Sequence, residues 1–454
     1  MRGHLRGATT PTRPENLPLD GGSSLQDPEV DEVADCAQYP IPDTPTSMTV
    51  LSTAPSDLGL DEVLQLPDSE TVETLLDHYS QKLASLAVWI DSDSNPYRCQ
   101  VIPLARRWPG LMLAILAVSG QHRSPDRVLE ERFPARARDA AVRLISQHIR
   151  AVTSRIAEGG HLRHELGMES AEWMLASMLT LANYEMLDNG AGFSDAHRHA
   201  ARILVRAIRS TGKQNSALFT FLTNQLSIYD VLACTTEVEA ADAEDVLLPD
   251  PTDSDKLFTG FLRIVHEVMV KAQRHRQVSG GFGLGSGLGS YQQACEANDI
   301  EARFEIARGT TLMVAGRLPM SSDAQSRDFI RLVSIYHQAG LLYTWSILPH
   351  LRPSTQRLEV CAEGLFASLE GMETPSTMLH NLPWPLFAAG IGCRGLVQRQ
   401  ACITATFGKL ITETGFSNYG DVLSFLQLYW KETALSWAQL AVQWRSSGRS
   451  ILPV

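Results

Sequence analysis

The spacing of apolar residues along most of the chain is helical. The clearest case lies within residues 136–157, where Val142, Ile145, Ile149, Val152 and Ile156 recur at intervals of three and four. Such intervals place them on one stripe of an amphipathic helix. Similar patterns cover residues 69–86, 100–121, 170–187, 194–210, 216–235, 255–276, 291–316, 324–347, 354–370, 385–414 and 420–446. Because the alternation typical of strands is nearly absent, we predict an all-α body, a single large domain of about a dozen helices.

The first 68 residues have a different composition. They are rich in Pro, Gly, Ser, Thr and Asp, and they show no helical or strand period before Leu58. Such a segment buries too little apolar surface to offset the entropy lost on ordering. We therefore predict a disordered acidic tail over residues 1–68 and a helical domain over residues 69–454. Residues 57–66 alternate acids with leucines, which is typical of activation segments and also of a solvated linker, the interpretation that we favour.

The net charge of −12 is concentrated in this tail. Thirteen acidic residues and no Lys or Arg lie between Glu15 and Glu70, and three arginines precede them. Subtracting both groups from the total leaves residues 71–454 with a net charge of −2. Phosphate contacts need clustered Lys and Arg, so an acidic chain is poorly suited to bind nucleic acid unaided.

Membrane and secreted proteins are also disfavoured. The longest apolar run, Trp108 to Gly120, is shorter than the roughly 18 residues that span a bilayer, and the N-terminus lacks the apolar core of a secretory signal. The cysteines are scattered without a C-x-x-C pair, so neither a disulfide framework nor a structural zinc site is indicated. We expect a soluble intracellular protein in which several cysteines are small core residues. The cysteines are Cys36, Cys99, Cys234, Cys295, Cys361, Cys393 and Cys402.

Glycine-rich and acidic segments interrupt the helical pattern. In Gly280–Gly289 the glycines alternate, so no G-x-G-x-x-G occurs, and no Lys-Ser/Thr follows as in a phosphate-binding loop. We predict a surface loop there and another in the acidic stretch Glu237–Asp255. Asp91–Asn95 begins like a calcium loop, but Pro96 stands where that loop needs glycine. A turn that starts the next helix is the better interpretation.

Histidine patterns give no metal site either. His164-Glu165 and His266-Glu267 lack the second histidine that a zinc protease places one turn on. His197 and His199 lie two apart, on different faces of a helix. The residues thus indicate no catalytic, cofactor-binding or metal-ligating position, and we expect no cofactor and no enzymatic activity.

Tryptophans near the C-terminus indicate packing. Trp430, Trp437 and Trp444 recur every seven residues, so we predict that they share one face of the last helix, packed on the body or, less favoured, on a second copy. In Asn381–Gly390, two prolines flank Trp384 before an apolar run. Proline is tolerated in a first helical turn, so the segment predicts a buried helix start anchored by Trp384.

Several segments together resemble the fungal-specific transcription factor domain, the middle homology region of zinc-cluster regulators. The resemblance runs from about Ser69 to Trp444 and implies a nuclear regulator of fungal genes, often of a metabolic or secondary-metabolite cluster. No functional residue is transferred by it, because the matching positions are architectural. The segments that carry it are Leu75–Tyr79, Asn95–Arg98, Val101–Ala105, Leu111–Ser119 with His122, Phe221–Leu232, Tyr336–Tyr343, Leu382–Gly390, Arg399, Gly415-Phe416 and Trp430.

One departure from the family is the DNA reader. The family's zinc cluster begins C-x2-C-x6-C with a basic linker, whereas residues 1–68 contain only Cys36. The first hypothesis is a regulator that reaches DNA only indirectly, through a DNA-binding partner or a homodimer. A gene model lacking an upstream exon predicts the same body. The alternative is a helical domain repurposed to bind a metabolite or to act as a pathway enzyme; a third hypothesis is an interaction scaffold.

Overall fold

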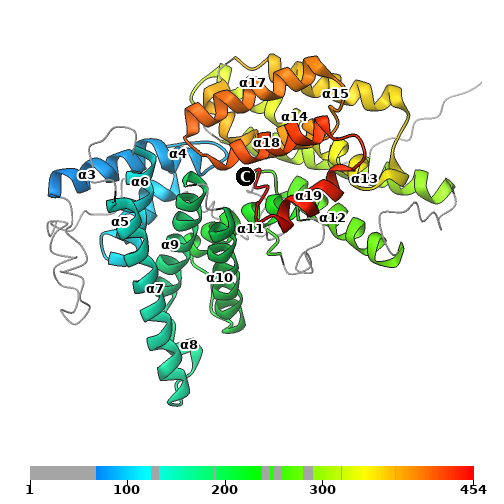
Figure 1. The fold of residues 1–454 in the computed structure, drawn as a ribbon. Coiled ribbons are helices and arrows are strands. Elements are labelled where there is room, and N and C mark those ends of the chain that lie inside the picture. The colour runs from blue at the N-terminus through cyan, green and yellow to red at the C-terminus, as the bar shows by residue number, and fades with distance from the viewer. Residues whose placement is uncertain are drawn as a thin grey trace, which may run out of the picture. The chain divides into compact units, whose positions relative to one another are not determined.

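In the computed structural model every described element is a helix, and the prediction of an all-α body is confirmed (Figure 1). The structure describes residues 68–123, 132–188, 191–237, 246–249, 257–279, 290–318, 320–373 and 375–454. The helices within these ranges are slightly more numerous than the predicted dozen. The stretch 57–66, nearly all of the tail over residues 1–68, most of the acidic loop and the glycine run lie outside the described residues.

The first group of helices packs around two apolar ones, α6 and α9. In α6 every residue from Gly110 to Gly120 is buried, and α9 is buried along nearly its whole length, as expected for helices that are apolar on all sides. The group comprises α3 (Ser69–His78), a π-helical turn (Tyr79–Leu83), α4 (Ala84–Leu86), a second π-helical turn (Tyr97–Val101), α5 (Ile102–Ala105), α6 (Pro109–Arg123), α7 (Phe133–Ala157), α8 (Leu162–Glu165), α9 (Met168–Leu187) and α10 (Ala191–Ser210).

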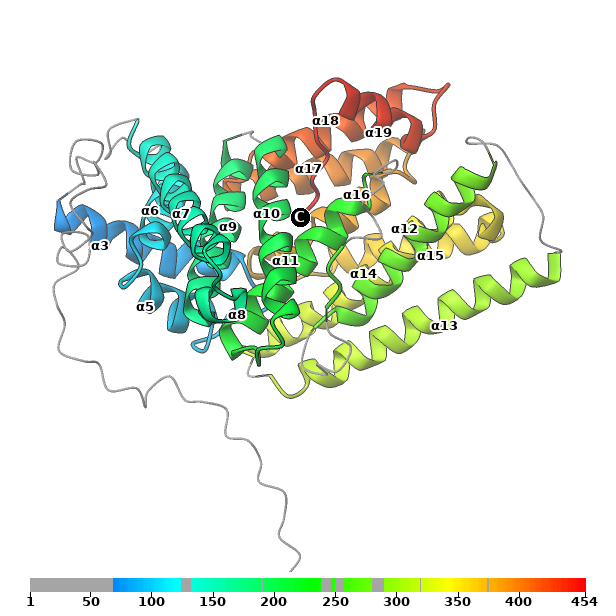
Figure 2. The ribbon, with the colours of Figure 1, turned by 90° about the horizontal axis from the view of Figure 1, so that it is seen from below.

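The second group packs around α14, which contacts α12, α13, α15 and α16. The long helices α12 and α13 are the clearest of them in Figure 2. The group comprises α12 (Thr259–Ser279), α13 (Ser290–Ala315), α14 (Asp323–Ile347), α15 (Thr355–Glu370), α16 (Pro383–Gly390), α17 (Val397–Thr414), α18 (Asn418–Lys431) and α19 (Trp437–Ser446), with short 3-10 turns at Pro349–Leu351, Pro375–Thr377 and Leu379–Asn381.

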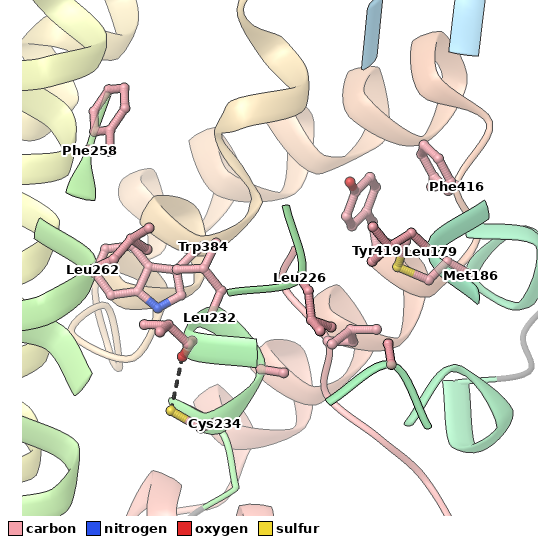
Figure 3. Packing of buried hydrophobic residues seen from close by; sticks show 14 of the residues in the cluster. Leu179, Met186, Leu226, Leu232, Cys234, Phe258, Leu262, Trp384, Phe416 and Tyr419 are labelled. Atoms are coloured by element: carbon pink, nitrogen blue, oxygen red, sulfur yellow. Dashed lines mark hydrogen bonds between the residues drawn. The ribbon is translucent and has the colours of Figure 1, made fainter. Parts of the chain in front are cut away.

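Helix α11 (Ala217–Cys234) joins the two groups. It packs on α9 and α10 on one side and on α12 on the other. Ser216 caps its start by accepting a hydrogen bond from the Phe219 amide at 3.0 Å, which satisfies one of the four free amides of a first turn. Aliphatic and aromatic side chains from both groups meet around this helix (Figure 3). A single core therefore runs through the helical domain.

The last residues of the chain are built into this core. Leu452 is 1% exposed, and its carbonyl accepts a hydrogen bond from Asn418 Nδ2 at 2.8 Å. The Tyr419 hydroxyl donates to the Val454 carbonyl at 2.7 Å, and Thr236 Oγ1 donates to the Ile451 carbonyl at 2.6 Å. Residues 451–454 thus tie α18 to the end of α11.

Three predicted helices are each divided in the structure. The pattern over 385–414 covers α16 and α17, which are separated by residues 391–396, where Gly395 has a φ of +80°. The pattern over 420–446 covers α18 and α19, and Ser436 begins the second with a reciprocal capping box to Gln439. Both breaks rest on local backbone signals that a hydrophobic period does not contain. The pattern over 100–121 is likewise interrupted, between α5 and α6.

The predicted apolar stripe of α7 is wrong for two of its five members. Val142 and Ile149 are 37% and 43% exposed. The buried face is rotated and runs through Ala137, Ala141 and Ile145. Alanines allow helices to approach closely, so a count of large apolar residues missed the face that packs on α6.

Candidate functional site

The segment around Trp384 is a core anchor, as predicted. Trp384 is 1% exposed, and its ring centroid lies 5.8 Å from that of Tyr336 and 5.8 Å from that of Tyr343. Its Nε1 donates a hydrogen bond to Thr235 Oγ1 at 3.1 Å. Figure 3 shows the indole beside Leu232, among other buried hydrophobic side chains. This residue fills the interior and anchors the start of α16.

Two threonines at the end of α11 connect this anchor with other elements. The Thr235 carbonyl accepts a hydrogen bond from the Tyr343 hydroxyl of α14 at 2.8 Å, while its side chain accepts from Trp384 of α16. Thr236 binds the Ile451 carbonyl of the chain end. We call Thr235 and Thr236 the α11 junction, because three distant parts of the chain meet there.

The Asn95–Arg98 motif is also architectural. Arg98 makes a bidentate ion pair with Asp91, with nitrogen–oxygen distances of 2.6 and 2.7 Å. The same guanidinium donates to the Ser80 carbonyl at 2.7 Å, and Asn95 Nδ2 donates to Asp91 Oδ1 at 2.9 Å. The predicted turn at Asp91–Pro96 is therefore held by its own carboxylate, which supports the two π-helical turns.

His122 and Gly415, far apart in the sequence, meet in the structure. His122 Nε2 lies 3.0 Å from the Thr414 carbonyl, and His78 Nε2 lies 3.0 Å from His122 Nδ1. Gly415 has a φ of +72° and ends α17; a Cβ there would lie 3.0 Å from His122 Nε2. Burial lowers the pKa of His122, so the ring is held neutral. These residues join α3, α6 and α17.

The predicted single face for Trp430, Trp437 and Trp444 is wrong, because Trp430 belongs to α18 and the other two to α19. The preference for packing on the body is confirmed. Trp437 and Trp444 are 4% and 7% exposed, and Trp430 Nε1 donates to the Gly390 carbonyl at 2.8 Å.

The described residues contain no group of three or more His, Cys, Asp or Glu side chains arranged to hold a metal ion. The ring centroids of His161 and His164 lie 6.5 Å apart, but two imidazoles alone do not make such a group. Among the cysteines, Cys234 and Cys393 are buried, as expected for several of them, whereas Cys295 is exposed.

Polar groups converge at one place that the sequence did not single out, a cavity of about 320 Å³ beside α10. We call it the charged cavity. Its wall combines α10, the end of α11, the segment 246–249 and the last turn of α19. The lining residues are Asp195, Ala196, Arg198, His199, Arg202, Asp230, Cys234, Glu237, Val246 and Arg445.

Charges of opposite sign alternate along its wall. Arg198 pairs with Asp195 one turn before it on α10. Asp230 Oδ1 of α11 lies 3.5 Å from Arg198 Nη1 and 3.6 Å from Arg202 Nη1. The chain of charges therefore runs from Asp195 through Arg198 and Asp230 to Arg202.

Two atoms of this chain of charges are buried without a hydrogen-bond partner among the described residues, Arg198 Nε and Asp230 Oδ2. The Asp230 side chain is 0% exposed. Burial raises its pKa to about 6, although Arg198 and Arg202 act in the opposite direction. Buried polar atoms are nearly always satisfied in folded proteins, so unpaired ones beside a cavity mark a place where a ligand or water completes the bonds.

A sequence signal for this cavity existed. Asp230 is the only charged residue between Ala217 and Cys234, and a lone acid in an apolar helix needs a buried partner. Asp195, Arg198 and Arg202 follow at intervals of three and four on one helix face. Which helix faces Asp230 is decided by tertiary packing, so the two halves of the site were not connected beforehand.

Within the described residues, α11 is the one helix long and apolar enough to cross a membrane by length and composition. Two thirds of it, 67%, is buried inside the protein. A core helix of a folded protein has the same properties, so this is weak support for a membrane span.

Comparison with known families gives one match. The model of the fungal specific transcription factor domain matches residues 74–449. The match takes in both helical groups, α11 and the charged cavity. Searches of curated proteins and of solved structures gave no significant match. On the strength of the family match, which spans most of its length, this chain belongs to the fungal specific transcription factor domain family.

Proposed function

We propose that this fungal transcriptional regulator controls a metabolic or secondary-metabolite gene cluster from the nucleus, and that it acts through its helical domain without a zinc cluster of its own. The observation that carries the proposal is the family match over residues 74–449. Within the 454 residues no two cysteines have the C-x2-C spacing with which a zinc cluster begins. The helical domain is then the part that acts.

DNA is reached through a protein partner in this proposal. Residues 71–454 are close to neutral and the segment before them is acidic, so the phosphate backbone offers little attraction. A DNA-binding regulator or a second copy of the chain would supply the basic surface. Light scattering of the purified protein, and crosslinking in nuclear extract, distinguish these two partners.

The direct test combines gene deletion with chromatin immunoprecipitation. We expect deletion to change a defined set of transcripts and the protein to occupy the promoters of those genes. The purified protein alone should not shift DNA containing those promoters at physiological salt. Unchanged transcripts together with an accumulated pathway intermediate would refute the regulatory role and favour the enzyme alternative. Sequencing the 5′ end of the transcript shows whether an upstream C-x2-C-x6-C frame exists.

One observation favours a second function, the binding of a metabolite. The charged cavity brings ionisable groups from three helices to one space of about 320 Å³. This fits a regulatory input better than catalysis, because burial strongly raises the pKa of Cys234, the thiol in the wall, and leaves it unreactive.

A further inference from the structure

Most residues that line the charged cavity have ionisable side chains. Seven of its ten residues are ionisable Asp, Glu, Arg or His, and only Ala196 and Val246 offer hydrocarbon alone. An apolar ligand would displace water from these groups without replacing the hydrogen bonds that the water makes. The cavity volume of about 320 Å³ lies at the low end of the roughly 300–1,000 Å³ found for ligand sites. The chemistry therefore favours a small, polar ligand.

The signs of the charges narrow the choice. Three guanidiniums, of Arg198, Arg202 and Arg445, face three carboxylates, of Asp195, Asp230 and Glu237. A ligand with a single charge would meet as many like charges as opposite ones. A molecule that carries both signs on neighbouring atoms can oppose each with its complement.

Three ion pairs of the cavity wall are loose, whereas a fourth, between Arg198 and Asp195, is in close contact. Three nitrogen–oxygen distances in the wall are long: 3.5 Å and 3.6 Å from Asp230 to Arg198 and Arg202, and 3.5 Å from Glu237 to Arg445. By contrast, Arg98 and Asp91 approach to 2.6 Å outside the cavity. Charge-assisted hydrogen bonds are usually about 2.7–2.9 Å. The guanidiniums of Arg202 and Arg445 thus retain donors for a ligand.

From these three observations we propose that the charged cavity binds a small zwitterion of the α-amino acid type. Its carboxylate is received by Arg202 and Arg445, and its ammonium group by Asp195 and Glu237. These four side chains are 16%, 55%, 32% and 23% exposed, so a ligand reaches them. Asp230, which is fully buried, is a positioning residue that holds the two α10 guanidiniums toward the cavity.

The site is connected to the core of the domain. Glu237 follows the α11 junction directly, and Thr235 binds both Tyr343 and Trp384. A ligand that fixes Glu237 restrains the segment to which α14 and α16 are bonded. The claim that an occupied cavity alters transcription rests on the proposed function. The claim that the cavity binds a ligand does not.

The test uses the purified full chain and the twenty proteinogenic amino acids, each at millimolar concentration, in thermal-shift assays followed by calorimetry. We expect at least one to raise Tm in a saturable way. The carboxylic acid lacking its amino group, and the amine lacking its carboxylate, should each bind at least tenfold more weakly.

Variants tie the binding to the cavity. Arg202→Ala should raise Kd at least tenfold, and Arg445→Gln, on the exposed rim, at least threefold without changing the Tm of the free protein. Arg209→Ala, an exposed arginine on the same helix, is the matched control and should bind as the wild type does. Rim variant Arg445→Gln keeps the test decisive if Arg202→Ala fails to fold.

The inference is overturned if no amino acid binds saturably, if the deaminated acid binds as tightly as its parent, or if both cavity variants bind normally. Failure of the regulatory proposal is a separate result. In that case the ligand binds and the variants weaken it, but feeding the ligand to the organism leaves transcripts unchanged.

Discussion

Replacing Trp384 tests the claim that the most recognisable segment of the chain is structural. The indole is 1% exposed, lies between Tyr336 and Tyr343, and donates one hydrogen bond to Thr235. Trp384→Ala removes the ring and the bond together. Trp384→Phe keeps most of the apolar volume and removes only the donor and part of the ring. The two variants therefore separate packing from hydrogen bonding.

The magnitudes follow from the contacts. Large-to-small changes at buried aromatic positions cost about 3–5 kcal/mol, and we expect Trp384→Ala within that range. In Trp384→Phe, Thr235 Oγ1 keeps its own donor bond to the Leu232 carbonyl at 2.6 Å. Only an acceptor is left unpaired, so about 1–2 kcal/mol is expected. Thr235→Val combined with Trp384→Phe should show a coupling energy of about 0.5–1.5 kcal/mol.

Urea unfolding followed by both circular dichroism and tryptophan fluorescence measures these changes, wherever the two curves coincide. A loss below about 1 kcal/mol for Trp384→Ala would refute the assignment of this ring to the core. Additive effects of Trp384→Phe and Thr235→Val would show that the hydrogen bond between these residues contributes nothing to stability. The inference that the α11 junction stabilises the domain through this bond would then be wrong.

Three further predictions concern packing, pH and ion pairs. A Cβ at Gly340 would lie 2.5 Å from a phenylalanine ring of α13, so Gly340→Ala should lower the free energy of unfolding by about 1–3 kcal/mol. A Cβ at Gly408 would have nothing within 4 Å, so Gly408→Ala should raise the free energy of unfolding, measured in urea, by about 0.5–1 kcal/mol. Burial lowers the pKa of His380 and of four other described histidines, so the unfolded chain takes up protons first as pH falls below about 6.5. Burial raises the pKa of three carboxyl groups, those of Asp230, Glu301 and Asp421, which act in the opposite sense but are outnumbered. Tm should therefore drop between pH 7.5 and 5.5, and less in His380→Gln; an equal drop in both proteins would exclude this histidine as a cause. Arg98→Ala leaves the half-buried carboxylate of Asp91 without its partner and should lower the free energy of unfolding by about 1–3 kcal/mol. Arg106→Ala breaks a pair whose side chains are 39% and 44% exposed and should lower it by under about 1 kcal/mol. Comparable losses for the two variants would contradict the ranking by burial.

Helix existence was predictable because it depends on local periodicity. The buried positions of α6, α9 and α11 coincide with apolar runs, and the Trp384 anchor followed from a proline-flanked apolar segment. Helix ends were less predictable. The break before α19 depends on one capping serine, Ser436, and the break before α17 on Gly395. Such signals occupy one or two residues and do not alter an average over a helix.

The charged cavity was beyond prediction from the sequence for another reason. Asp195, Arg198 and Arg202 lie together on α10, but Asp230 and Arg445 come from helices distant in the chain. Only the packing of α11 beside α10 brings the acid under the two guanidiniums. One amino-acid sequence shows the periodicity within each helix, but it does not show which helix faces contact one another. The buried face of α7 was misjudged for the same reason.

The built-in chain end has a practical consequence for every experiment named above. The carbonyls of residues 451, 452 and 454 accept hydrogen bonds from Thr236, Asn418 and Tyr419, and Leu452 is buried. An epitope tag or fluorescent protein fused after Val454 would disturb residues 451–454, which are hydrogen-bonded to the α11 junction through Thr236. Reporter fusions should be joined at the amino end, or spaced from Val454 by a flexible glycine-serine linker, so that the label does not create the phenotype it is meant to record.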